Sequence, residues 1–127
     1  MKYTFQFNKD TGICTVRVTG INKRPDDSIV LQQFACDFAD ENGCRLFLFD
    51  MTQAEIIGGT MATFDTGTVP VDPDHTHAGQ KIALVYSECT HDEKFLENVA
   101  VNRGFQLRVF DETDKALEWL KPKEDYI

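Results

Sequence analysis

The sequence has no long apolar run, and it is poor in positive charge. The longest apolar runs, such as residues 46–49 and 82–85, span four residues, whereas a membrane-spanning helix needs roughly 20. Thirteen Lys and Arg stand against 21 Asp and Glu, which gives a net charge of −8 at pH 7. That charge repels nucleic-acid phosphates and anionic lipid surfaces. We therefore expect no integral membrane segment and no nucleic-acid partner.

Two further absences concern the cellular compartment. Residues 1–7 have no extended apolar region and alternate like a strand, so we expect no signal peptide. The four cysteines include no Cys-x-x-Cys pair; they are Cys14, Cys36, Cys44 and Cys89. An acidic chain without an export signal favours the reducing cytoplasm, where thiols stay free. Cys14 shares one side of an alternating strand with Val16 and Val18, which predicts a buried residue rather than a nucleophile.

What is present has the composition of one folded domain. The chain has 127 residues, of which 42% are hydrophobic and 27% charged, close to ordinary globular usage. We expect a single domain over residues 1–121 and a short acidic C-terminal tail over residues 122–127.

Hydrophobic periodicity predicts the order of the elements. Alternation on both sides of the turn 8–12 predicts an antiparallel hairpin, and nearly continuous apolar runs predict strands buried on both faces. The expected strands are 3–7, 13–19, 45–50, 81–86 and 105–110. The first expected helix follows the loop 22–28 and ends near Asn42, and a short second helix covers 52–57. A third helix begins at Thr90 and ends at Gly104, and the last covers 113–120. A broken helix is also possible over 61–64.

These elements follow the order β-β-α-β-(α)-β-α-β-α. Strands that alternate with helices favour a parallel sheet, so we predict an α/β fold with a mixed, mostly parallel sheet, an N-terminal antiparallel hairpin and flanking helices. Gly43 is expected to end the first helix, and Thr90 with Glu93 forms a capping box that opens a later one. His91, Glu93 and Glu97 are expected on the solvated surface of that helix.

The segment 58–79 is the first place to look for function, because a long connection in a small domain is often functional. Asp72, Asp74, His75 and His77 place two carboxylates and two imidazoles within six residues, a donor set that a metal ion accepts. A solvated loop explains the same residues, so both interpretations stay open.

Two weaker signals point to binding. Gly58, Gly59 and Thr60 could offer backbone amides to an anion, although the spacing of a phosphate-binding loop is missing and a hinge explains the glycines as well. Ile29 and Val101 lie off the apolar stripes of their helices, as residues of a partner surface would.

Several stretches of the chain resemble the SpoIIAA-like family of small stand-alone bacterial proteins, within the STAS fold of the anti-sigma-factor antagonists. The most specific stretch is Phe95–Phe105, followed by Arg108–Asp111 and Ala116–Leu120. A further stretch, Gly43–Thr52, is similar to the strand that ends in an aspartate in both groups.

The resemblance implies a STAS-like fold, a bacterial cytoplasm, frequent dimers, and protein interaction or ligand sensing rather than covalent catalysis. We expect no cofactor. The antagonists carry a phosphorylated serine in an Asp-Ser-Ser-Gly-like turn, whereas residues 54–60 here read AEIIGGT. Thr52 and Thr60 are the nearest hydroxyls, so a phosphorylation switch is not carried over. The residues expected to bind a partner or ligand are Asp50, Thr52, Gly58, Gly59, Thr60, Met61, Phe64, His75 and His77.

Two alternatives to an interaction module remain. The layout is also similar to the lipid-binding domain of SEC14-like proteins, so a small hydrophobic ligand could enter a pocket lined by Met61 and Phe64. A metal-dependent enzyme that uses His75 and His77 is the other alternative.

Overall fold

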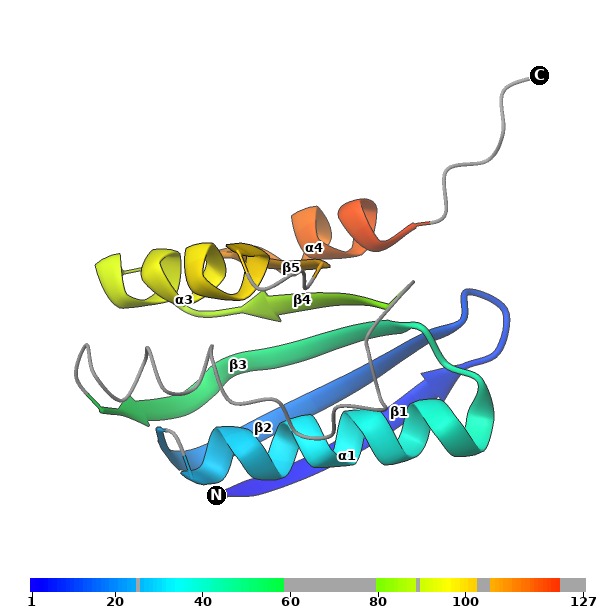
Figure 1. Cartoon of the computed structure of the whole chain (residues 1–127), viewed down its shortest axis with the longest axis horizontal. Helices are drawn as coiled ribbons and strands as arrows, with labels where there is room; N and C mark the ends of the chain where they lie inside the picture. The colour runs from blue at the N-terminus through cyan, green and yellow to red at the C-terminus, as the bar shows by residue number, and fades with distance from the viewer. Residues whose placement is uncertain (25, 59–79, 89, 103–105, 122–127) are drawn as a thin grey trace.

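The structure is a computed structural model that describes residues 1–24, 26–58, 80–88, 90–102 and 106–121, the side chain of Asp92 excepted. The elements are β1 (Lys2–Asn8), β2 (Ile13–Lys23), α1 (Asp26–Asn42), β3 (Leu46–Ile57), β4 (Lys81–Val85), α3 (His91–Asn102), β5 (Gln106–Phe110) and α4 (Thr113–Leu120). One sheet has the order β1-β2-β3-β4-β5 (Figure 1). β1 pairs with β2 antiparallel, and the other neighbours pair parallel. The expected α/β fold with its N-terminal hairpin is confirmed.

Helices pack on both faces of the sheet, which explains why the central strands are apolar on both sides. On one face, buried residues of β2 and β3 meet α1; the cluster includes Cys14, Val16, Val18, Leu31, Ala35, Phe47, Phe49 and Met51. On the other face, α4 packs on β3 and β4; this cluster includes Leu48, Ala83, Val85, Ala116 and Leu120. The predicted burial of Cys14 is thus confirmed.

β2 and β3 are both longer than periodicity predicts. β2 continues to Lys23, where we expected a loop from residue 22, and β3 continues to Ile57, where we expected a helix over 52–57; both expectations are wrong. Gly20 adopts φ +81° inside β2, a conformation that glycine accepts without strain. The strand therefore continues through Gly20, although a glycine followed by a polar segment is typical of the end of a strand.

The extension of β3 begins with an irregularity in the pairing. Arg17 pairs with Asp50, but Thr19 pairs with Gln53, so β3 contains one residue more than β2 between these points. The Asp50 carboxylate accepts hydrogen bonds from the Thr52 amide at 3.0 Å and hydroxyl at 2.6 Å. A bulge of this kind bends a strand. β3 leaves β4 at Asp50 and continues beside β2 alone.

Several predicted helix boundaries agree with the structure. α1 ends at Asn42, and Gly43 follows with φ +67° while its amide donates to the Ala39 carbonyl at 2.8 Å. α4 spans the expected residues. The expected end of α3 near Gly104 lies outside the described residues, as does the broken helix over 61–64. Within the described ranges, no helix is both long and apolar enough to cross a bilayer.

The surface residues of the helices agree only in part with the expectations. Val101 is exposed, whereas Ile29 is half-buried. Glu97, expected on a solvated face, accepts a hydrogen bond from the Val109 amide of β5 at 2.7 Å. Glu97 thereby satisfies a backbone donor at the edge of the sheet.

Phe47→Ala should lower the free energy of unfolding by about 3–5 kcal/mol, because the Phe47 side chain is fully buried in the cluster between the sheet and α1. Ile57→Ala in the same strand should cost less than about 1 kcal/mol, since Ile57 is 43% exposed. Urea unfolding curves of the two variants test this; equal losses would contradict the packing described.

Candidate functional site

The candidate site lies at the carboxyl edge of the parallel strands. β2, β3 and β4 run in the same direction, so their C-terminal ends meet at one edge of the sheet. α1 begins shortly after β2, and α3 begins shortly after β4 (Figure 1). Open α/β sheets bind their ligands outside the carboxyl ends of the strands. The side chains at this edge are therefore the ones to consider.

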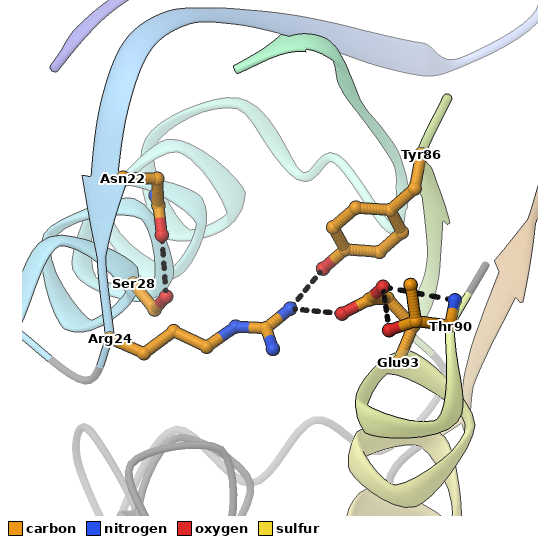
Figure 2. Close-up of polar contacts among 6 residues, drawn as sticks. All are labelled: Asn22, Arg24, Ser28, Tyr86, Thr90 and Glu93. Carbon is orange, nitrogen blue, oxygen red and sulfur yellow. Dashed lines mark hydrogen bonds and ion pairs between the residues drawn. The ribbon is translucent and has the colours of Figure 1, made fainter. Parts of the chain in front are cut away.

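A buried ion pair connects the end of β2 with the start of α3 (Figure 2). Nη2 of Arg24 lies 3.2 Å from Oε2 of Glu93 and donates a hydrogen bond to the Tyr86 hydroxyl at 3.1 Å. The side chains of Arg24 and Glu93 are only 2% and 8% exposed. The guanidinium also lies 5.8 Å from the centre of the Tyr86 ring. A buried ion pair of this kind fixes the end of β2 and the start of α3 relative to each other.

Glu93 has a second role as the cap of α3. Its Oε1 accepts hydrogen bonds from the Thr90 amide at 3.1 Å and hydroxyl at 2.7 Å, so the capping interaction predicted from Thr90 and Glu93 is confirmed on the glutamate side. The expected exposure of Glu93 is wrong, since the residue is buried, whereas His91 is exposed as expected. One carboxylate thus caps a helix with one oxygen and binds Arg24 with the other.

A second buried polar residue, Asn22, lies near the end of β2. Its side chain is fully buried, and its amide nitrogen donates to the Met1 sulfur at 3.2 Å. Its oxygen accepts a hydrogen bond from the Ser28 hydroxyl at 3.2 Å, which Figure 2 shows. The Lys23 amide donates to the Asp27 carboxylate at 2.8 Å. The turn from β2 into α1 is therefore held by side chains on both of its sides.

A cavity of about 230 Å³ lies beside the ion pair. One part of its wall is apolar, from Met51, Ala54 and Ile56, and the other part is polar. The polar lining residues are Arg24, Tyr86, Ser87, Glu88, Thr90 and Glu93, and Gly58 completes the wall. Such a surface suits a small group with an apolar body and a hydrogen-bonding end.

The structure separates the predicted binding residues that it describes. Asp50 and Thr52 hydrogen-bond to each other, and Asp50 lies 3.6 Å from the exposed Arg17. Neither lines the cavity, whereas Gly58 does. The other predicted residues lie outside the described ranges; they are Gly59, Thr60, Met61, Phe64, Asp72, Asp74, His75 and His77. Among the described residues, no three His, Cys, Asp or Glu side chains are placed to hold a metal ion.

The sequence did not point to Asn22, Arg24 or Tyr86 as site residues. Val16, Val18, Asn22 and Arg24 are all buried at even spacing, with Arg24 directly after the end of β2. The sequence does not show this alternation beyond Val18, because the buried Asn22 and Arg24 are polar and the exposed Ile21 is apolar. Gly20 and Pro25 also indicated an earlier end of the strand, since both residue types commonly end strands.

The buried thiols are protected from ionisation. Burial, with a smaller contribution from nearby Cys44, raises the pKa of Cys14 from 9.0 to about 12. Burial also raises the pKa of Cys44, against the lowering effect of backbone hydrogen bonds. Since only the thiolate is a nucleophile, neither cysteine is suited to covalent catalysis at neutral pH.

At pH 8, Cys14 should resist alkylation by iodoacetamide in the native protein, because a pKa of about 12 leaves only about one thiol in 10,000 ionised. Mass spectrometry of a Cys89→Ser variant before and after addition of urea measures this. Rapid labelling of Cys14 without urea would contradict its burial.

Arg24→Met should lower the free energy of unfolding by about 3–5 kcal/mol, because it leaves the buried Glu93 carboxylate without its cation. The double variant Arg24→Met, Glu93→Leu should recover at least half of that loss, since no charge then stays buried. Urea unfolding of the three proteins gives the coupling energy. Additive losses would show that the pair contributes no interaction of its own.

Comparison with known proteins supports the fold. No protein-family model matches the chain, and no curated protein matches it either. Among solved structures, an uncharacterised protein of the DUF3478 family with a SpoIIAA-like fold, from Shewanella loihica, is similar at a TM-score of 0.53 and 14% identity, over 94% of this chain and 92% of that one. An anti-sigma factor antagonist from Mycobacterium paratuberculosis is similar at 0.52 and 13%, over 94% of each chain. The chain therefore has a SpoIIAA-like fold, as its sequence resemblance implied.

Proposed function

We propose that this chain is a non-enzymatic, cytoplasmic interaction module that binds a segment of a protein partner at the carboxyl edge of its parallel strands. The observation that carries the proposal is the cavity of about 230 Å³ beside the buried pair of Arg24 and Glu93. The ion pair orders the cavity wall before any partner arrives, which lowers the entropy lost on binding.

The size and chemistry of the cavity favour a side chain of a partner over a whole small molecule. Pockets for drug-sized ligands usually measure about 300–1,000 Å³, so this cavity is small for a lipid. Met51, Ala54 and Ile56 suit an apolar stem, while Ser87 and Thr90 suit a polar end. The negative net charge of the chain favours a neutral or basic segment. One structural neighbour is an anti-sigma factor antagonist, and its name describes action on another protein.

A small hydrophobic ligand is the second candidate, and the apolar wall formed by Met51, Ala54 and Ile56 is the observation that favours it. Native mass spectrometry of gently purified protein separates the candidates. A bound polypeptide supports the interaction module, whereas an organic mass that denaturation releases supports the carrier. A stoichiometric metal that is lost on His75→Ala, His77→Ala would instead support the metal-dependent enzyme.

Ala54→Phe should weaken partner binding, because the added ring occupies space in the cavity that the partner side chain would fill. Gln53→Phe adds the same ring at the exposed neighbouring position of β3 and serves as the matched control. We expect the wild type and the control to retain the same polypeptide in native mass spectra, and Ala54→Phe to retain at least about tenfold less. Equal retention by all three proteins would place the binding surface elsewhere.

A further inference from the structure

The two edge strands of the sheet, β1 and β5, differ in how their outer sides are protected. At the β5 edge, the Glu97 carboxylate accepts a hydrogen bond from the Val109 amide at 2.7 Å. At the other edge, β1 is a seven-residue strand without Pro or Gly, and Lys2 is its only charged residue. Proteins usually protect edge strands with charges, prolines, bulges or covering segments, because a bare edge pairs with another strand. Apart from Lys2, β1 lacks the charges and prolines that keep an edge strand from pairing.

The exposed aromatic rings of β1 are fixed in position by α1. Phe5 is 52% exposed and Tyr3 36% exposed. The Phe5 ring lies 5.0 Å from that of Phe34 and 5.2 Å from that of Phe38, and the Tyr3 ring lies 5.4 Å from that of Phe34. Phe7 contacts Phe38 at 5.5 Å. The rings therefore present a preformed apolar surface along the edge, which a second strand could cover at little entropic cost.

We propose that β1 pairs antiparallel with β1 of a second copy of this chain, about a twofold axis at Phe5, and joins two five-stranded sheets into one. This register places Phe5 opposite Phe5 and Tyr3 opposite Phe7 of the second copy. It is the one in which all seven residues, Lys2–Asn8, find a partner. Residues directly opposite in an antiparallel pair share a face, so all six aromatic side chains of the two strands lie on the α1 side.

Charge also favours a second copy as the occupant. The chain carries −8 overall, which opposes self-association, but Lys2 makes the β1 strand itself positive. In the proposed register, Lys2 lies opposite the neutral Asn8 of the second copy, and the turn beyond it carries both Lys9 and Asp10. No like charges therefore face each other along the paired strands, and the positive strand meets a molecule of negative net charge.

Thr4 and Gln6 allow a test that leaves the aromatic surface unchanged. Both are exposed, and each lies opposite the other in the second copy. Thr4→Lys, Gln6→Lys places lysine against lysine twice, whereas the matched control Thr4→Lys, Gln6→Glu places lysine against glutamate twice. Like charges directly opposite destabilise a strand pair and opposite charges stabilise it.

Size-exclusion chromatography with light scattering over a dilution series measures the dissociation constant of each protein. We expect a wild-type dimer of twice the chain mass. The lysine pair should raise the dissociation constant about tenfold or more, although it makes the net charge less negative, and the lysine–glutamate control should stay close to wild type. Thermal melting checks that both variants are folded.

Three results would overturn the proposal. The first is a wild-type protein that stays monomeric at high micromolar concentration. The second is a dimer that the lysine pair and the control weaken equally, because the interface would then lie elsewhere. The third is a complex with another polypeptide that is lost only in the lysine pair, since β1 would then take a foreign strand.

Discussion

One face of β2 joins the hydrophobic core to the candidate site, and both depend on its alternation. Val16 and Val18 are fully buried on this face, and Asn22 and, directly after the strand, Arg24 follow at even spacing and are buried but polar. A buried guanidinium without a counter-ion costs several kcal/mol. Glu93 must therefore stand opposite Arg24. This requirement fixes the start of α3 relative to the end of β2, although β3 and β4 lie between them in the chain.

The irregular pairing at Asp50 gives β3 two roles. Up to Asp50, β3 is a central strand between β2 and β4. After the extra residue, β3 pairs only with β2, and Met51, Ala54 and Ile56 form the apolar wall of the cavity. The Asp50 carboxylate thus stabilises the bulge through its hydrogen bonds with Thr52.

The two proposals concern different parts of the molecule. The proposed partner site is at the carboxyl edge, whereas the proposed self-pairing uses β1, an edge strand of the sheet in the part of the chain that the structure describes. Because the paired β1 strands run in opposite directions, the two carboxyl edges of the dimer would point away from each other. Both partner sites would stay accessible, and a dimer of this kind would bind two partner segments at once, which raises avidity without any new contact.

The class of fold, the order of the elements and the end of α1 at Gly43 could be predicted from the sequence, because they follow from local periodicity and from the conformational freedom of single residues. The capping role of Glu93 was also visible in its spacing from Thr90. Only the tertiary structure decided that β2 and β3 extend to Lys23 and Ile57 and that Arg24 meets Glu93. Strand extension depends on a neighbouring strand, and a buried ion pair depends on residues nearly 70 positions apart, so neither is encoded within any one segment of the chain.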